Sequence, residues 1–256
     1  MTAESLRKAD LLREHLRGEG TELCLFDLDD TLIYTERIFR SQMERFAAHV
    51  AMHTKSDYRD TWGLLVRFND EAFSEYKVTK SRWHEVVRRF VDKFPDQKAV
   101  IKNGLEILLD IYNVAPGFRE GAEETLGAFI ATGVELGLVT HADYQWTRLK
   151  YALLEMDRFI PWKNVHVVNP YEFKTSSDWL DAISKHGFLP EQTMVVGDNV
   201  LGDIIAAREA GVEKTVYVEG TTWKLYLEGE FPSGTIVVKG GIGYLLDTLI
   251  TPAPVV

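Results

Sequence analysis

The chain has 256 residues, of which 45% are hydrophobic and 27% charged, the composition of an ordinary globular protein. Its formal net charge of -10 and its pI near 5.2 argue against nucleic acid or an anionic membrane as the main partner, although a local basic pocket for a small anion is compatible with both. The single cysteine, Cys24, excludes an internal disulfide and is expected to be a buried core residue. No segment resembles a signal peptide or reaches the roughly 18–20 apolar residues of a membrane span, so a cytoplasmic protein is expected.

The first third of the chain contains one predicted strand followed by a long helical segment. An amphipathic helix is expected over residues 1–20 and an apolar strand over residues 23–28. Between residues 34 and 114 there is no convincing strand, and helical patterns cover residues 37–51, 58–76, 81–93 and 103–112. The Pro116-Gly117 pair marks a return linker over residues 113–117. This segment is therefore predicted to be an all-helical domain inserted after the first strand.

The rest of the chain alternates between helices and short β-branched strands. Helices are predicted over residues 120–132, 144–154, 177–185 and 203–210, with a closing helix over 240–249. Strands are predicted over residues 134–139, 165–168, 194–196, 215–218 and 235–238, most of them apolar on both faces. Gly133, Gly187 and Gly211 stand where C-capping glycines belong, and Ser176 or Ser177 could cap the helix that follows.

This alternation predicts an α/β fold with a doubly wound, mainly parallel sheet, that is, a Rossmann-like core carrying an inserted helical cap. The predicted core comprises residues 1–33 and 115–256, and the predicted cap comprises residues 34–114. Ligands of such sheets bind beyond the carboxyl ends of the strands.

Three carboxylates follow the first predicted strand in the sequence Asp27-Leu28-Asp29-Asp30-Thr31. Period two places Asp27 and Asp29 on one side if the extended geometry continues, and two adjacent carboxylates repel unless a proton or a cation intervenes. A divalent, oxygen-preferring metal would supply that compensation. The competing interpretation is an acidic turn in which Asp30 or Thr31 caps the next helix.

A second acidic pair follows the strand predicted over residues 194–196. Asp198 stands at the carboxyl end of that strand, after Gly197, which lets the backbone turn close to a bound group. Asp203 stands at a helix start, where it could equally be an ordinary carboxylate favoured by the helix dipole. The two acidic strand ends would converge if both strands were central in one sheet.

Taken together, these motifs resemble those of the haloacid dehalogenase-like (HAD) hydrolase superfamily, in its phosphatase branch with a class-1 helical cap. The resemblance extends over nearly the whole chain, and its specificity lies in the order of four motifs at predicted strand ends. These are Asp-x-Asp-x-Thr at residues 27–31, a hydroxyl residue at Thr140, a lone lysine at Lys174, and Gly-Asp with a second Asp five positions later at Asp198 and Asp203.

The resemblance implies a role for each matched residue. Asp27 would attack phosphorus to form an aspartyl-phosphate, and Asp29 would serve as general acid and then as base. Mg²⁺ would be bound by the side chains of Asp27 and Asp198 and by the backbone carbonyl of Asp29, with Asp203 holding a metal-bound water or the lysine. Thr140 would hydrogen-bond the phosphoryl group, and Lys174 would balance its charge.

Two positions depart from the family pattern. Lys174 is followed by Thr-Ser where many relatives have Lys-Pro, and Lys163 is a competitor that should lie at the wrong end of its strand. His141 replaces an Asn that many relatives carry, and it could contact phosphate or simply begin a helix. In the cap, four basic residues could meet an anionic substrate tail, although such residues usually form a solvated face. They are Arg67, Lys77, Lys80 and Arg82.

The predicted function is that of a Mg²⁺-dependent phosphatase that hydrolyses a small phosphorylated metabolite. Asp29 argues against a haloacid dehalogenase, which needs no acid at that position. A phosphomutase of the same superfamily keeps all four motifs and is the alternative. A non-catalytic metal-dependent binding module on the same scaffold is a second alternative, from another class of protein.

Overall fold

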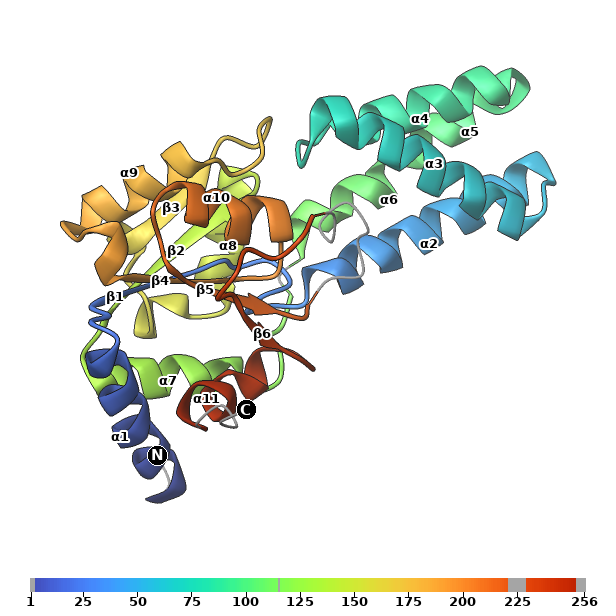
Figure 1. Cartoon of the computed structure of the whole chain (residues 1–256). Helices are drawn as coiled ribbons and strands as arrows, with labels where there is room; N and C mark the ends of the chain where they lie inside the picture. The colour runs from blue at the N-terminus through green and yellow to red at the C-terminus, as the bar shows by residue number, and fades with distance from the viewer. Residues whose placement is uncertain (1–2, 115, 221–228, 252–256) are drawn as a thin grey trace.

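The computed structural model describes residues 3–114, 116–220 and 229–251. Six strands form one parallel sheet in the order β3-β2-β1-β4-β5-β6. Their bounds are β1 Leu23–Phe26, β2 Glu135–His141, β3 Val165–Val168, β4 Thr193–Gly197, β5 Lys214–Val218 and β6 Ile236–Val238. The central position of β1, between β2 and β4, is that of a doubly wound sheet, whose switch point lies between the first and fourth strands (Figure 1).

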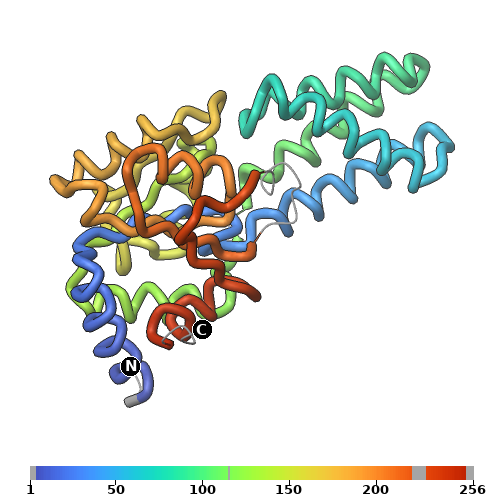
Figure 2. The backbone as a smooth tube through the Cα atoms, viewed as in Figure 1, coloured from blue at the N-terminus to red at the C-terminus, as the bar shows by residue number. Residues whose placement is uncertain are grey.

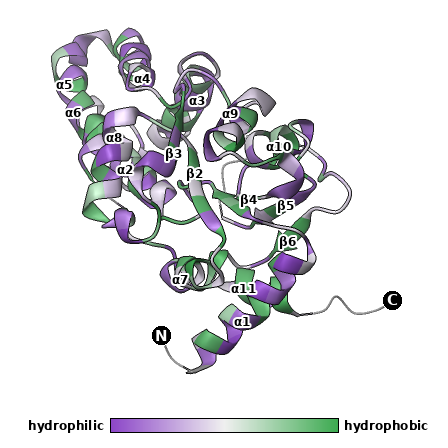
Figure 3. Cartoon of the chain, turned by 90° about the vertical axis from the view of Figure 1, so that its left-hand side faces the viewer, coloured by the Kyte–Doolittle hydropathy of each residue, from purple (hydrophilic) through white to green (hydrophobic). Residues whose placement is uncertain are grey.

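Helices cover both faces of the sheet, because successive residues of each strand point to opposite sides. On one face, Cys24 and Phe26 pack with α1 (Ala3–Gly18), α7 (Ala122–Thr132) and α11 (Leu245–Ile250). On the other face, Leu23 and Leu25 pack with α9 (Ser176–His186) and α10 (Ala206–Glu209). The backbone trace in Figure 2 shows α1 and α11 side by side, and Lys8 and Asp247 join them with an ion pair of 2.8 Å. The strands carry mostly apolar residues, whereas α1 alternates polar and apolar positions (Figure 3).

The segment between the turn after β1 and α7 is mainly helical and has its own hydrophobic cluster. It contains α2 (Thr35–Thr54), α3 (Tyr58–Tyr76), α4 (Ser81–Lys93), η1 (Pro95–Gln97), α5 (Lys98–Asn103), α6 (Leu105–Leu109) and η2 (Asp110–Asn113). Phe46, Trp83 and Phe90 are fully buried at its centre, and Trp146 of α8 (Tyr144–Leu153) packs against the same cluster. Figure 1 shows these helices extending away from the sheet beyond the strand ends. We call this segment the cap; its boundaries at 34 and 114 remain a prediction.

The predicted fold class is confirmed, and the differences in detail have local causes. The helix predicted over 103–112 is divided into α6 and η2, with α5 before it. The N-cap of α9 is Thr175, not Ser176 or Ser177, because Asp178 stands three residues later and completes a capping box. The helix predicted over 203–210 begins earlier, as a π-helical turn called η6 (Val200–Ile205).

Candidate active site

A tight turn after β1 presents the first acidic motif at the edge of the sheet. The N–H of Asp27 donates to the carbonyl of Val196 at 2.8 Å, which extends the pairing of β1 with β4 by one residue. Asp30 adopts a left-handed conformation with φ of 58°, which an Asp tolerates better than a bulky residue. The N–H groups of Leu32 and Ile33 both donate to the carbonyl of Leu28 and close the turn. The side chains of Asp27 and Asp29 therefore project from the same hydrogen-bonded turn, two residues apart.

Asp27, Asp198 and Asp203 form a buried carboxylate cluster, in which one oxygen of each lies within 4.8 Å of the others. Asp27 is only 5% exposed and Asp203 is fully buried. Lys174 joins them, since its Nζ donates to Asp27 Oδ1 and to Asp203 Oδ1, the latter at 2.6 Å. Three carboxylates thus share one ammonium group, which leaves an excess of negative charge at the carboxyl ends of β1 and β4.

The loop after β4 is shaped around the carboxylate of Asp203. The backbone N–H of Asn199 donates to Asp203 Oδ2 at 3.0 Å, and the indole N–H of Trp179 in α9 donates to the carbonyl of Gly202 at 2.8 Å. A side chain at Gly197 would collide with the Asp203 carboxylate. The glycine therefore makes room for the Asp203 side chain. The sequence had suggested instead that it makes room for a bound group.

The electrostatics of the cluster favour protonation of Asp27 and Asp198 unless a cation binds. Burial raises the pKa of Asp27 to about 7, although Lys174 opposes the shift. Burial, reinforced by Asp27 and Asp203, also raises the pKa of Asp198. Burial lowers the pKa of Lys174, but Asp203 and Asp27 outweigh it and raise the pKa above its usual range. The lysine is therefore charged, and its charge alone does not keep Asp27 and Asp198 ionised.

The donor set fits a hard divalent cation. Within the described residues, Oδ2 of Asp27 and Oδ2 of Asp198 are buried without a hydrogen-bond partner, while Oδ1 of Asp198 accepts from Thr31 at 3.2 Å. Buried carboxylate oxygens without donors are unfavourable unless a cation or a water satisfies them. Carboxylate oxygens are the ligands that Mg²⁺ prefers. The cluster can therefore hold a divalent metal.

Asp29 points away from this cluster and forms a second group of polar contacts. Its Oδ1 accepts from Thr35 Oγ1 at 2.5 Å, and its Oδ2 accepts from Thr140 Oγ1 at 3.3 Å. Lys150 Nζ donates to both carboxylate oxygens, at 2.5 and 2.7 Å. Side chains from the β1 turn, α2, β2 and α8 thus meet at one carboxylate. The side chain of Asp29 is not part of the carboxylate cluster, which is consistent with the expectation that only its backbone carbonyl binds metal.

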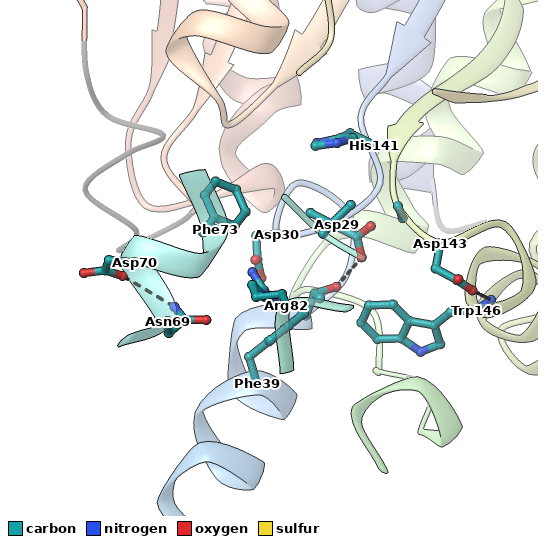
Figure 4. A pocket seen from close by; sticks show the side chains of 13 residues that line it. Asp29, Asp30, Phe39, Asn69, Asp70, Phe73, Arg82, His141, Asp143 and Trp146 are labelled. Carbon is teal, nitrogen blue, oxygen red and sulfur yellow. Dashed lines mark hydrogen bonds between the residues drawn. The ribbon is translucent and has the colours of Figure 1, made fainter. Parts of the chain in front are cut away.

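A pocket lies between the cap and the carboxyl end of the sheet, with about 670 Å³ not occupied by protein atoms. Figure 4 shows Asp29 on its core side and Arg82 of α4 on its cap side. Arg82 is buried against aromatic rings, with its guanidinium carbon 5.2 Å from the centre of Phe39 and 5.4 Å from that of Phe73. Asp27 is not among the residues that line this pocket. The pocket thus has carboxylates at its core end, and at its cap end Arg82 among aromatic rings, with Asp70 also in the wall.

His141 lies in the wall of the pocket, so the structure places it at the site and not on a remote surface. Burial and the charge of Lys174 lower the pKa of His141 to about 4, so its ring is neutral near pH 7. Its Nε2 is buried and has no hydrogen-bond partner among the described residues. The ring packs 6.1 Å from that of Phe173, measured between ring centres.

The predicted site residues are brought together from distant parts of the sequence. Asp27, Asp198, Asp203 and Lys174 form one group, and Asp29 and Thr140 form the adjoining group. Lys163 is exposed and lies in η4 (Trp162–Asn164), directly before β3. It therefore lies at the amino end of that strand, whereas the site lies at the carboxyl ends. Of the basic cap residues, Arg82 lines the pocket, whereas Arg67 lies on another surface groove of the cap.

Sequence reasoning missed Lys150 and Thr35, which both contact Asp29. A lysine in a helix ordinarily lies on the solvated face. The helical phase of α8 nevertheless contained a signal, because Lys150 falls four residues after Trp146 and three after Thr147, on the stripe that is buried. Thr35 gave no comparable signal at the start of α2.

Comparisons with known proteins agree with this geometry. The family model of haloacid dehalogenase-like hydrolases matches residues 21–211. Glyceraldehyde 3-phosphate phosphatase of Pyrococcus furiosus is 25% identical over an alignment of 228 residues, and the match covers 81% of this chain and 85% of that protein. The chain therefore belongs to the haloacid dehalogenase-like hydrolase family, and the prediction of an HAD-like phosphoric monoester hydrolase is confirmed.

Solved structures support the same fold. A haloacid dehalogenase-like family hydrolase from Xanthomonas campestris superposes with a TM-score of 0.65 at 16% identity, over 83% of this chain and 84% of the other. A β-phosphoglucomutase candidate from Thermotoga maritima superposes with a TM-score of 0.64 at 18% identity, over 90% and 98% of the two chains. Among the described residues, no helix is both long and apolar enough to span a bilayer.

Proposed function

We propose that this protein is a Mg²⁺-dependent phosphatase that hydrolyses a small phosphorylated metabolite through an aspartyl-phosphate on Asp27. One observation carries the proposal: Lys174 bridges Asp27 and Asp203 beside Asp198, where the carboxyl ends of the two central strands meet. A carboxylate poised next to a lysine and a candidate cation site is suited to attack a phosphate ester. The cytoplasmic location expected from the sequence remains a prediction.

In the first step, an oxygen of Asp27 attacks phosphorus and forms a mixed anhydride, while the bond from phosphorus to the leaving oxygen breaks. Protonated Asp29 gives its proton to that oxygen, so the product leaves as a neutral alcohol. Lys174 stabilises the negative charge shared by Asp27 and the phosphoryl group. Bound at Asp27 and Asp198, with the Asp29 carbonyl as a further ligand, Mg²⁺ would offset the repulsion between carboxylates and phosphate and keep Asp27 ionised.

In the second step, water attacks the phosphorus of the aspartyl-phosphate, and Asp29 takes a proton from that water. The phosphorus–carboxyl oxygen bond breaks, which releases inorganic phosphate and restores both aspartates. Thr140 Oγ1 is fully buried and donates to Asp29 Oδ2 at 3.3 Å, and its hydroxyl hydrogen would turn to a phosphoryl oxygen when the substrate binds. Positioning and charge compensation account for most of the rate enhancement in phosphoryl transfer.

The substrate is proposed to be small, with a polar or anionic group at the end remote from the phosphate. Asp29 and Arg82 both line the pocket, together with Phe39, Phe73 and Trp146 (Figure 4). A relative named for glyceraldehyde 3-phosphate also supports a small phosphorylated substrate. The guanidinium would bind a carboxylate or hydroxyl oxygen of the substrate, and the rings would exclude water from its middle.

A phosphomutase is the second candidate, because one superposed structure is described as a β-phosphoglucomutase candidate. A mutase must return the phosphoryl group to an intermediate before water removes it, and it needs a bisphosphate to begin. A panel of phosphorylated metabolites with Mg²⁺ separates the two functions. Steady release of inorganic phosphate without a bisphosphate supports the phosphatase, isomerisation that requires a bisphosphate supports the mutase, and no turnover of any kind would support the binding module.

A further inference from the structure

We propose that Lys150 is the positioning residue for Asp29, and that it stabilises the negative charge that develops on Asp29 as the leaving oxygen is protonated. The inference rests on the proposed function, because it assigns Asp29 the role of general acid and base. It concerns a lysine outside the four motifs and 121 residues from its partner in sequence.

The contact is a close, two-pronged ion pair in a buried place. Nζ of Lys150 lies 2.5 Å from Oδ1 and 2.7 Å from Oδ2 of Asp29, and the lysine side chain is fully buried. The Asp29 side chain is 21% exposed and forms part of the pocket wall. The ammonium group therefore contacts the carboxylate from the buried side, and the exposed part of the carboxylate faces the pocket in which the substrate would bind.

The surroundings of Lys150 hold it in this position. Its Nζ lies 4.1 Å from the centre of the Trp146 ring. Trp146 also belongs to α8, and its side chain is buried against the hydrophobic cluster of the cap. The indole N–H of Trp146 donates to the carbonyl of Val114 at 2.9 Å and so fixes the ring. Burying a lysine is unfavourable unless it is paired, and Asp29 supplies both oxygens of that pair. Because burying a lysine is unfavourable, its presence here indicates that it serves Asp29 and does not merely fill the apolar core.

Two hydroxyl groups also donate hydrogen bonds to the Asp29 carboxylate. Thr35, the first residue of the cap helix α2, donates to Oδ1, and Thr140, at the strand end, donates to Oδ2. Without the lysine, only these two hydroxyl groups would orient the carboxylate, one on each side. Lys150 contacts both oxygens and therefore fixes the rotation of the whole group. A misplacement of about 1 Å at a reacting group can reduce a rate by about 100-fold.

Charge compensation adds a chemical consequence. The ion pair holds Asp29 as a carboxylate, so the group must take up a proton before it can protonate the leaving oxygen. When it gives that proton away, the fixed ammonium of Lys150 stabilises the carboxylate that is regenerated. This stabilisation matters most for an alkyl phosphate, whose leaving oxygen needs the proton, and least for an aryl phosphate with an acidic phenol as leaving group. The lysine should therefore affect the two kinds of ester unequally, which a role limited to folding would not.

The test compares Lys150→Met with the wild type on an alkyl phosphate and on 4-nitrophenyl phosphate, both with Mg²⁺. We expect kcat/KM, which reports the steps up to departure of the leaving group, to fall by about 100-fold for the alkyl ester, with a much smaller loss for the aryl ester. Lys163→Met, at an exposed lysine outside the site, is the matched control and should retain wild-type activity on both. Lys150→Gln carries the same test if the methionine variant is not folded, as judged by circular dichroism.

A double-mutant cycle with Asp29→Asn supplies the second readout. If Lys150 acts through Asp29, then Lys150→Met should cost almost nothing further once Asp29 has been changed. Equal losses on both esters, or a full loss on top of Asp29→Asn, would overturn the inference. If the wild type hydrolyses neither ester nor any phosphorylated metabolite, the proposed function fails instead.

Discussion

The two ends of the pocket are built from different kinds of residue and differ in what the sequence revealed of them. The core end is a group of carboxylates and lysines near the carboxyl ends of the strands, where we expect a single charge change to alter the chemistry. The cap end is a set of aromatic side chains around Arg82, where we expect a change to alter which molecule fits. We therefore expect the sheet edge to determine the reaction and the cap helices to determine the substrate, and experiments can separate the two.

Replacing the proposed nucleophile should have the largest effect. We expect Asp27→Asn to reduce phosphate release by a factor of at least about 10⁴, because the amide oxygen is a poor nucleophile and no covalent intermediate forms. The variant should nevertheless melt no lower than the wild type in metal-free buffer, since it removes a buried carboxylate that repels its neighbours. Thermal unfolding monitored beside activity checks both statements. Substantial activity in a preparation free of other phosphatases would refute the assigned nucleophile.

Removal of the metal should come next. Excess EDTA is expected to abolish activity, and Mg²⁺ should raise the melting temperature of the wild type, because a ligand of the folded state alone stabilises it. Asp198→Asn replaces a carboxylate whose Oδ2 has no hydrogen-bond partner among the described residues, and it should lose this thermal shift. The matched control is Asp92→Asn, at an exposed cap residue paired with Arg88, which should keep it. Unchanged rates in EDTA would remove the metal from the mechanism.

At the cap end, Arg82→Met should affect binding more than chemistry. Methionine retains much of the apolar stem against Phe39 and Phe73 but loses the charge. For the best natural substrate we expect KM to rise by about 10- to 100-fold, the effect of one charged hydrogen bond, with kcat changed much less. Arg67→Met, on another face of the cap, is the control and should leave both constants unchanged. A loss confined to kcat would place Arg82 outside substrate recognition.

The smallest effect is expected from His141→Asn, measured as stability against pH in EDTA. Burial and Lys174 lower the folded-state pKa to about 4, whereas the unfolded chain has an ordinary value near 6.5. Between pH 6.5 and about pH 4, His141 is therefore protonated in the unfolded state but neutral in the folded state. The free energy of unfolding falls by up to about 1 kcal/mol per pH unit over this range. The groups around the ring are Lys174, Asp29, Asp178, the Pro170 carbonyl and Phe173.

In the asparagine variant this share of the pH dependence should disappear, while the contributions of the carboxylates remain in both proteins. The difference between the two curves is thus the quantity to measure. Parallel curves between pH 6.5 and 4 would show that the His141 ring gains a proton freely in the folded protein.

The core end could be predicted from sequence because its signals are local. Each apolar strand is followed directly by its polar residue, as Asp27, Thr140 and Asp198 illustrate, and parallel strands bring such positions to one edge. The cap helices were likewise evident from their periodicity, and α3 and α4 have the predicted bounds. Such patterns determine an element and its register without knowledge of its neighbours.

What could not be predicted depends on contacts between distant residues. Lys150 has the chemistry of a surface residue, and only the folded position of Asp29 makes it part of the site. The helix after β4 begins early with Asn199 as its N-cap, whose side chain accepts from the N–H groups of Leu201 and Gly202, and the distant Trp179 donates to the Gly202 carbonyl in this turn. The α9 cap is a different case, because the Thr175-x-x-Asp178 spacing was visible in the sequence and was assigned one residue too late.

The most direct test of the central claim is to trap the covalent intermediate. Wild-type protein mixed with substrate and Mg²⁺, quenched in acid within the first turnover and digested, should yield the peptide containing Asp27 with the added mass of one phosphoryl group. Fragmentation should place that mass on Asp27, and treatment with hydroxylamine should remove it, since an acyl phosphate is readily cleaved. Phosphate found on another residue, or brisk turnover with no modified peptide at any quench time, would contradict the account.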